Sequence, residues 1–152
     1  MLKTPPFLPI EGLINVRTIP LPPLPNRGQI LRSGETEYTT ESGKKALLDL
    51  GITRVFDLRS PKEGPSSTTG AFTVPGIIVV NVPARAVSRS DNLGHTFSMF
   101  QSGGDDPFLE SYKEVLDQGP DPIRAVFEFI RDRLPLGEGC LIHCTGKYTL
   151  GV

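Results

Sequence analysis

Residues 140–147 read Cys-Leu-Ile-His-Cys-Thr-Gly-Lys and carry the strongest single indication of the fold. Their first part, 140–143, is a short apolar run and predicts a buried strand, whereas Gly146 and its polar neighbours predict a loop. A histidine and a cysteine, His143 and Cys144, therefore stand where a strand ends. In open α/β sheets the ligand lies beyond the carboxyl ends of the strands, so a functional site is expected at this position.

Three further strands are predicted before this segment, at residues 28–32, 52–58 and 77–82. The segment 52–58 is rich in β-branched and aromatic residues, and 77–82 is a continuous apolar run, which favours a strand covered on both faces. A shorter extended piece is expected at Leu13–Val16. Because helical patterns separate the strands, the sequence predicts an α/β domain with a mostly parallel sheet flanked by helices.

A first helix is predicted across residues 41–50. The threonine pair at 39–40 provides a cap for its start, and Gly51 stands where a left-handed residue ends a helix. Residues 61–76 are rich in Pro, Ser, Thr and Gly and predict a flexible loop. The polar segment 83–106 is long for a plain connection, and loops of this length often act as lids or binding loops.

Two more helices are predicted in the second half of the chain. One is capped by Asp106 and has Pro107 in its first turn, and the other is capped by Asp121 and followed by Pro122. Each carries apolar residues at helical spacing, which predicts one buried stripe per helix. The stripes consist of Phe108, Tyr112, Val115 and Leu116 in the first helix, and of Ile123, Val126, Phe127, Ile130 and Leu134 in the second.

Length and charge restrict the class of protein. At 152 residues the chain is long enough for one domain with a core and too short for two. We expect a Pro-rich arm over residues 1–27 and a single domain over 28–152. A net charge of −1 argues against a nucleic-acid partner, and no apolar run approaches the ~20 residues of a membrane span. The sequence indicates neither a signal peptide nor an oligomeric state.

The two cysteines, Cys140 and Cys144, lie four residues apart and do not resemble a disulfide framework. Working thiols fit a reducing compartment, so a cytoplasmic location is expected. Cys140 lies within the predicted strand and is expected in the core, whereas Cys144 could be either a small core residue or a nucleophile. With two histidines and two cysteines, no metal site stands out, and neither a metal nor a cofactor is expected.

The loop after Cys144 has the composition that phosphate binding needs. Successive backbone amides and a lysine, here Lys147, supply donors and positive charge for a phosphate dianion, and Gly146 lets the backbone curve tightly. The same surroundings lower the pKa of a cysteine below its usual ~8.5, and the thiolate can then attack phosphorus. A nucleotide P-loop is excluded because Leu141 and Tyr148 occupy positions where it needs glycine and serine or threonine.

Several segments in order carry a resemblance to a known family. Residues 140–147 resemble the signature of the atypical tyrosine/serine phosphatases of fungi and bacteria, whose usual run is His-Cys-Thr-Ala-Gly-Lys-Asp-Arg-Thr-Gly-Val. Residues 12–17 are similar to that family's Asn-hydrophobic-Arg segment, 30–35 to its hydrophobic-Arg-Ser-Gly strand, and 51–60 to its Gly-Ile…Asp-Leu-Arg-Ser strand. The resemblance implies a cysteine-phosphatase-like fold.

The resemblance also implies an activity and a set of site residues. The chain would be a protein tyrosine/serine phosphatase that hydrolyses phosphate monoesters through a phosphocysteine intermediate on Cys144, without a metal or cofactor. Thr145, Gly146 and Lys147 would form the phosphate cradle, and His143 would hold the loop and help to keep the thiol ionised. The substrate would be a phosphorylated protein or a phosphoinositide, and the sequence does not choose between phosphotyrosine, phosphoserine and phosphoinositide.

Arg59 follows a predicted strand beside this loop, and two roles are open for it. It could contact the substrate phosphate, or it could form an ordinary ion pair with Asp57 or Glu63. The same two alternatives, phosphate contact or a structural role, apply to Arg32.

The family's run does not continue beyond the cradle. One loop residue is missing, and the family's aspartate and arginine align with Tyr148 and Thr149. Threonine lacks the bidentate clamp of arginine, and tyrosine, with a pKa of ~10, is a poor acid at neutral pH. We therefore expect impaired turnover in a domain that is incomplete at its C-terminus, with a catalytically inactive pseudophosphatase as the alternative.

A retained intron over residues 146–152 is one hypothesis for this departure. Gly146-Lys147-Tyr148 can be encoded by GGT-AAG-TAT, which contains GTAAGTAT and resembles a splice-donor signal. Splicing at this point could restore an alanine codon after Thr145. Sequencing of the transcript tests the hypothesis, and a mature message that still encodes 146–152 before a stop codon would contradict it.

Overall fold

A computed structural model of the chain describes residues 7–22, 25–60, 72–84 and 120–145, together with Leu109, Lys113, Leu116 and Asp117, which are helical. Most of the helix predicted after Asp106, and most of the loops predicted at 61–76 and 83–106, lie outside the described residues. The described ranges include every predicted strand and two of the predicted helices.

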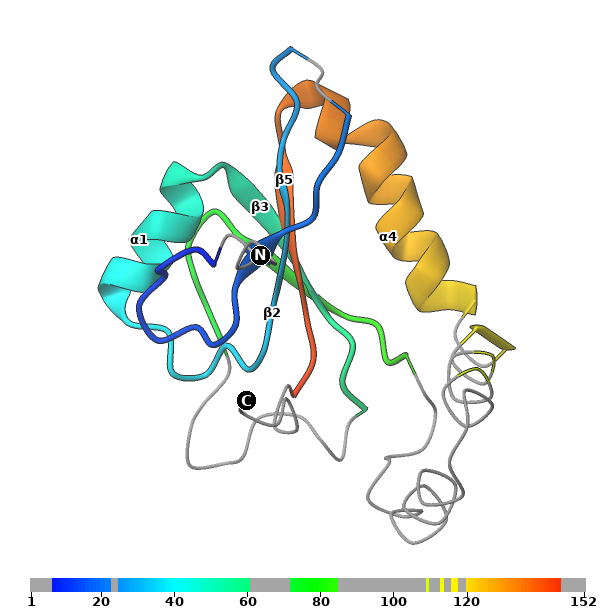
Figure 1. Ribbon diagram of the computed structural model, residues 1–152, viewed down its shortest axis with the longest axis horizontal. Helices are drawn as coiled ribbons and strands as arrows, with labels where there is room; N and C mark the ends of the chain where they lie inside the picture. The colour runs from blue at the N-terminus through cyan, green and yellow to red at the C-terminus, as the bar shows by residue number, and fades with distance from the viewer. Residues whose placement is uncertain are drawn as a thin grey trace, which may run out of the picture.

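The described strands form one five-stranded sheet in the order β1-β2-β5-β3-β4 (Figure 1). Strands β2, β5, β3 and β4 run parallel to one another, and β1 pairs antiparallel with β2. The prediction of an α/β domain with a mostly parallel sheet is therefore confirmed. The strands are β1 (Arg17–Thr18), β2 (Ile30–Ser33), β3 (Ile52–Asp57), β4 (Ile78–Asn81) and β5 (Gly139–His143).

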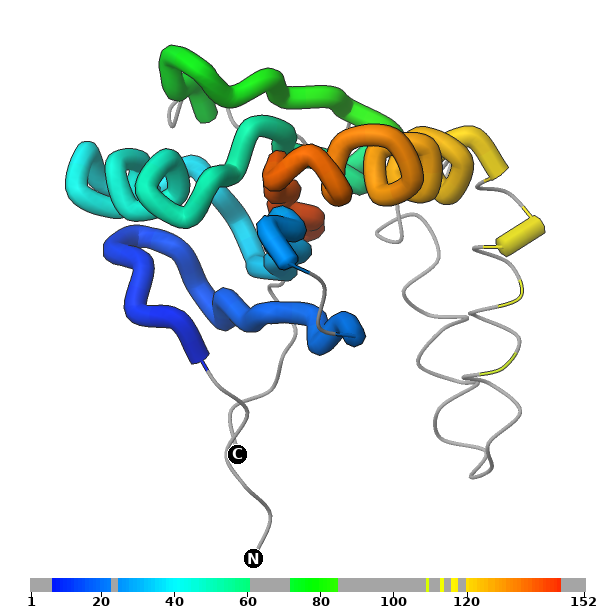
Figure 2. Tube along the Cα trace, turned by 90° about the horizontal axis from the view of Figure 1, so that it is seen from above, coloured from blue at the N-terminus to red at the C-terminus, as the bar shows by residue number. Residues whose placement is uncertain are grey.

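Helices lie on both faces of this sheet. Helix α1 (Glu41–Asp49) follows β2, helix α4 (Pro120–Asp132) comes before β5, and the short 3₁₀ helix η2 (Leu134–Leu136) joins α4 to β5. In the view along the strands, α1 lies on one side of the sheet and α4 on the other (Figure 2). This two-sided cover is what a parallel sheet requires, because its strands bury apolar side chains on both faces.

Two apolar cores fill the spaces between the sheet and these helices. Successive side chains of a strand point to opposite faces, so each central strand contributes to both cores. Residues of the N-terminal segment before β1 also enter the core on the α1 side. The α1 core contains Ile10, Val16, Leu31, Leu47, Ile52, Val55, Val74, Ile77 and Leu141, and the α4 core contains Ile30, Phe56, Phe129, Leu134 and Cys140.

Helix α1 begins and ends at the signals that the sequence carries. The Thr40 hydroxyl accepts a hydrogen bond from the backbone N–H of Gly43 at 3.1 Å, which satisfies one free donor of the first turn. At the other end Gly51 has a φ of +73°, a conformation that costs glycine little. The predicted start at the threonine pair and the predicted stop at Gly51 are both confirmed.

Two glycines let β5 approach β2 closely. A Cβ atom on Gly28 would lie 2.1 Å from the carbonyl oxygen of Glu138, and one on Gly139 would lie 2.9 Å from the carbonyl oxygen of Gln29. The backbone N–H of Cys140 donates to this same Gln29 oxygen at 2.9 Å. The start of β5 can therefore pair with β2 only where neither backbone carries a side chain.

Two strand predictions differ from the structure. The extended piece expected at Leu13–Val16 is displaced to β1, because Asn15 adopts a φ of 60° and turns the chain before the strand begins. The run at 77–82 contains β4, an edge strand of the described sheet in which Ile78 is 56% and Val79 is 40% exposed. The expectation that this run is covered on both faces is therefore wrong, since an apolar run alone does not distinguish a central strand from an edge strand.

The last predicted helix is present, but its start and its buried stripe differ. Helix α4 begins at Pro120, so Asp121 lies in its first turn rather than at its cap. Phe129 is buried and meets the ring of Phe56 edge to face at 5.8 Å between centroids, whereas Phe127 is 65% exposed. The two phenylalanines lie within one turn of each other, so the position of the sheet decides which of them is buried.

Replacement of each phenylalanine by alanine separates these two environments. We expect Phe129→Ala to lower the free energy of unfolding by about 3–5 kcal/mol, because removal of a buried ring leaves a cavity. Phe127→Ala is the matched control and should change it by less than about 0.5 kcal/mol. Urea unfolding followed by circular dichroism measures both, and equal losses in the two variants would contradict the packing of α4.

Candidate functional site

The carboxyl ends of the parallel strands meet at one edge of the sheet and carry a row of polar residues. The register places Ser33 of β2 beside His143 of β5, His143 beside Asp57 of β3, and Asp57 beside Asn81 of β4. His143 therefore lies in the middle of this row, at the end of the central strand. Ligands of parallel α/β sheets bind beyond this edge.

The two cysteines have opposite environments, although they lie on the same short segment. Cys144 follows the end of β5 and is exposed, whereas Cys140 lies within the strand and is buried. Burial raises the pKa of the Cys140 thiol to about 12, so this thiol stays protonated in the α4 core. The prediction that Cys140 is a core residue is confirmed.

The structure places the predicted cradle residues only in part. Thr145 follows Cys144 and is half-buried, and its hydroxyl oxygen is buried without a hydrogen-bond partner within the described ranges. Gly146 and Lys147 lie outside the described residues. His143, Cys144 and Thr145 are thus brought to the carboxyl edge, beside the ends of β2 and β3.

Arg59 lies close to the same edge and joins two carboxylates. Its Nε and Nη2 donate to the two carboxylate oxygens of Asp57 at 2.9 and 2.8 Å, and its Nη1 donates to a carboxylate oxygen of Glu37. The side chains of Arg59 and Glu37 are each 4% exposed. We call Glu37, Asp57 and Arg59 the carboxylate–arginine cluster. Its bidentate geometry is the strong form of an arginine–carboxylate contact.

The backbone around this cluster is held by further hydrogen bonds. The backbone N–H of Arg59 donates to Asp57 Oδ1 at 2.9 Å, so the carboxylate also closes the turn after β3. The Asn81 side-chain amide donates to the carbonyl oxygens of Asp57 and Arg59 at 3.1 and 3.0 Å. The end of β4 thus fixes the position of the segment that carries Arg59.

The charges of the cluster stabilise one another against burial. Burial by itself would raise the pKa of Asp57, but hydrogen bonds from the side chain and backbone of Arg59, with the charges of His143 and Arg59, hold that pKa below its ordinary value. Burial would lower the pKa of Arg59, and the two carboxylates raise it above its ordinary value instead. Loss of Arg59 would leave two carboxylates without their counter-charge, at a cost of about 3–5 kcal/mol.

His143 is 2% exposed and lies against this cluster, with its Nε2 3.7 Å from Asp57 Oδ2. Burial lowers the pKa of His143, and the charge of Arg59 adds to this effect. Asp57, Glu37 and the backbone of Cys144 oppose it without reversing it. The imidazole is therefore neutral near pH 7 and acts there as a buried polar group at the base of the Cys144 segment.

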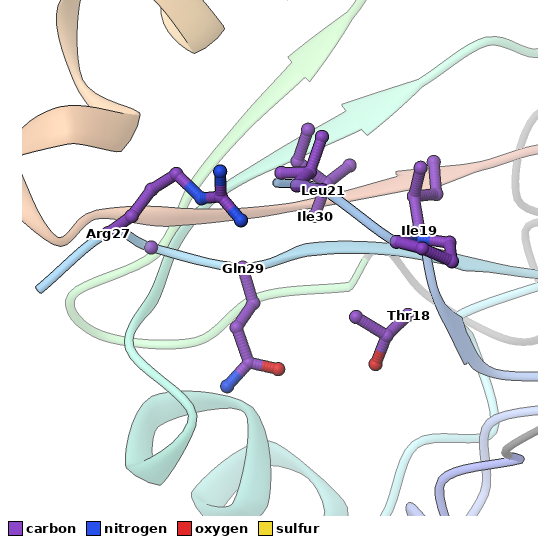
Figure 3. Close-up of a pocket in the computed structure, with 8 residues that line it drawn as sticks. Thr18, Ile19, Leu21, Arg27, Gln29 and Ile30 are labelled. Carbon is purple, nitrogen blue, oxygen red and sulfur yellow. The ribbon is translucent and has the colours of Figure 1, made fainter. Parts of the chain in front are cut away.

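A pocket of about 310 Å³ lies elsewhere in the domain, between residues 18–21 and 27–30 (Figure 3). In Figure 3 the side chains of Arg27 and Ile30 lie on the α4 side of β2, and that of Gln29 lies on the opposite side. This pocket is near the starts of β2 and β5, whereas the cysteine follows the carboxyl end of β5. None of the predicted site residues lines it.

Glu37 and Asn81 contribute to this region, although the sequence assigned neither of them a role. Glu37 belongs to the segment after β2, four residues beyond Ser33, and Asn81 is the last residue of β4. The feature of the sequence that could have indicated both is a polar residue at, or shortly after, the carboxyl end of a predicted strand. The contact between Glu37 and Arg59 joins positions 22 residues apart, which local patterns do not indicate.

The described part of the chain contains neither a metal-binding cluster nor a membrane-spanning helix. Within residues 7–22, 25–60, 72–84 and 120–145, no group of three or more His, Cys, Asp or Glu side chains could hold a metal ion. In the same ranges, no helix has the length and apolar character needed to cross a membrane.

The mostly parallel sheet, flanked by helices, with an exposed cysteine after its central strand, is consistent with a phosphatase-like α/β domain. Comparison with models of protein families matches the tyrosine phosphatase family over residues 8–147. This match covers most of the chain, and the chain therefore belongs to the tyrosine phosphatase family. A comparison with curated proteins finds no match.

The lowered pKa of His143 predicts a dependence of stability on pH. The folded state favours the neutral imidazole. The contribution of His143 to the free energy of unfolding is therefore complete above the unfolded-state pKa of ~6.5, and it is lost as the pH falls toward the folded-state pKa. We expect the free energy of unfolding to fall below pH ~6.5 by up to about 1.4 kcal/mol per pH unit. His143→Gln should remove this decline and His95→Gln should not; urea titrations between pH 7 and 5 measure the slopes.

The two thiols should also differ in reactivity. We expect iodoacetamide to label Cys144 at least about 100-fold faster than Cys140, because labelling of Cys140 requires the fold to open. Mass spectrometry of peptides after timed quenching measures both rates. Cys144→Ser should abolish the fast phase, and a fast phase that persists in this variant would contradict the exposure of Cys144.

Proposed function

We propose that this chain hydrolyses phosphate monoesters through a covalent phosphocysteine intermediate on Cys144. The observation that carries the proposal is an exposed cysteine directly after the central strand of a parallel sheet, next to a buried histidine. Membership of the tyrosine phosphatase family supports the same chemistry. The substrate is a phosphorylated protein or a phosphoinositide.

The reaction proceeds in two displacements at phosphorus. The Cys144 thiolate attacks, an S–P bond forms, the P–O bond of the ester breaks, and the leaving oxygen takes up a proton. Water then attacks the phosphocysteine, the S–P bond breaks, and inorganic phosphate and the thiolate are released. This sequence transfers no electrons and requires neither metal nor cofactor.

The residues after Cys144 bind the phosphate in this proposal. The backbone amides of Thr145, Gly146 and Lys147 donate to its oxygens, and the lysine supplies positive charge. The buried hydroxyl of Thr145, which has no partner among the described residues, is available for the loop or the ligand. His143 supports the start of the loop from inside the domain, where it lies beside Asp57.

Arg59 supports the site as a positioning residue. Its guanidinium already binds Asp57 and Glu37 and is almost fully buried, which favours the ion-pair role over a direct contact with phosphate. The contact with Asp57 supports the ion-pair alternative, and the other possible partner, Glu63, lies outside the described residues.

Slow turnover, or binding without turnover, is the second candidate function. Tyr148 and Thr149 stand where the family's run has aspartate and arginine. A threonine cannot clamp the three equatorial oxygens of a transferring phosphoryl group, and a tyrosine is a weak proton donor at neutral pH. We therefore propose a turnover far below that of a tyrosine phosphatase that carries the aspartate and the arginine.

Hydrolysis of a phosphotyrosine peptide tests both functions. We expect slow release of phosphate that Cys144→Ser abolishes, and a phosphorylated Cys144 peptide after acid quenching in mass spectrometry. Cys140→Ala is the control and should retain the rate, because this thiol is buried away from the loop. Release that survives Cys144→Ser would sink the proposed mechanism, and phosphate binding without release would favour the pseudophosphatase.

A further inference from the structure

Two arginines face one another across the antiparallel pair of strands at one side of the sheet. The register places Arg17 of β1 directly opposite Arg32 of β2. Residues in such positions have Cβ atoms about 5 Å apart, and like charges there destabilise the pairing. A pair of this kind is stabilised when an anion lies between or beside the two guanidinium groups.

Neither arginine has an anionic partner in the described part of the chain. Among the described residues, no ion pair or side-chain hydrogen bond includes Arg17 or Arg32, and the Nε of Arg17 is buried without a hydrogen-bond partner. The guanidinium of Arg17 stacks over the ring of Phe7 at 4.5 Å from its centroid, whereas Arg32 is exposed. Stacking on an aromatic ring restricts a guanidinium, and its terminal nitrogens remain the donors for a planar or tetrahedral anion.

This arginine pair lies close to Cys144 through the pairing of β2 with β5. Arg32 lies beside Ile142 of β5, and Ile142 packs against the α4 core. β5 ends at His143, so Cys144 follows Ile142 by two residues, just beyond the strand. One strand spacing of ~4.8 Å and two residues of ~3.3 Å rise separate the backbone positions of Arg32 and Cys144. A guanidinium and a nucleophile at this separation can contact two groups of one small ligand.

We propose that Arg17 and Arg32 form a second anion subsite beside the Cys144 loop, so that the preferred substrate is a phosphate monoester with a further phosphate or carboxylate group. The inference rests on the proposed function for the group that binds at Cys144. Arginine provides two parallel donors to such an anion. Ile30 and Ile142, the neighbours of Arg32 on the α4 side of the sheet, are apolar and do not compete for its donors. The subsite determines specificity and takes no part in the bond changes at phosphorus.

Protection of Cys144 from iodoacetamide measures the subsite without relying on turnover. The probes are phenyl phosphate, phenylene bisphosphate, and a phosphotyrosine peptide flanked by either two glutamates or two glutamines. In the wild-type chain the second anionic group should lower the protecting concentration about tenfold, as expected for charge-assisted hydrogen bonds. The bisphosphate and the acidic peptide report separately on phosphate and carboxylate as the second group.

Variants at the two arginines assign the effect. Arg32→Gln should remove most of the tenfold preference and leave protection by phenyl phosphate unchanged, and Arg32→Lys should restore part of it. Arg17→Gln tests the second arginine, with circular dichroism as a check of folding. Arg124→Gln is the matched control, because Arg124 is an exposed arginine of α4, 68% accessible, and should leave the preference unchanged.

Two results would overturn the subsite: equal protection by singly and doubly anionic probes, or a preference that survives replacement of both arginines. Absence of protection by phenyl phosphate would instead count against the proposed function at Cys144. In that case calorimetric titration with phenylene bisphosphate still tests the subsite. Binding by the wild type that is lost in Arg32→Gln would support the subsite, and absence of binding by the wild type would refute it.

Discussion

The parallel pairing of β5 with β2 and β3 is the interaction on which the rest of this domain depends. β5 lies between β2 and β3, so these two strands are held in one sheet only through it. β5 also contributes a buried side chain to each apolar core, Leu141 on the α1 side and Cys140 on the α4 side. The pairing joins segments that are far apart in sequence, so it carries a large loop-closure entropy and is supported by close backbone contact at Gly28 and Gly139.

The same pairing generates the site. Because β5 is the central strand, its carboxyl end carries His143 into the middle of the polar row, between residues of β2 and β3, and the next residue, Cys144, leaves the sheet and is exposed. The carboxylate–arginine cluster lies alongside and connects the segment after β2 with the turn after β3. Buried charges of this kind cost more to desolvate than apolar residues of similar size, so their value here lies in the positions they impose on the surrounding backbone.

The sequence predicts those parts of the candidate site in which a reactive side chain lies within, or next to, a recognisable local pattern. The apolar run at 140–143 followed by a polar loop predicts the end of β5 correctly, and it places Cys140 and Cys144 in different environments. Phe127 and Phe129 show the limit of such patterns, because both fit a helix and only the sheet beneath α4 selects Phe129. Glu37 shows a second limit, since its partner Arg59 comes near it only when β2 and β3 are held on either side of β5.

Local patterns in the chain were enough to predict the class of this domain, the limits of α1 at Thr40 and Gly51, and the strand that ends at His143, because periodicity, capping and turn propensity act over a few neighbouring residues. Three features emerge from the folded chain alone: 77–82 contains an edge strand, Arg59 pairs with two carboxylates, and Arg17 and Arg32 stand opposite one another on β1 and β2. These features depend on strand order and register, which arise from long-range pairing and are not encoded in any one segment.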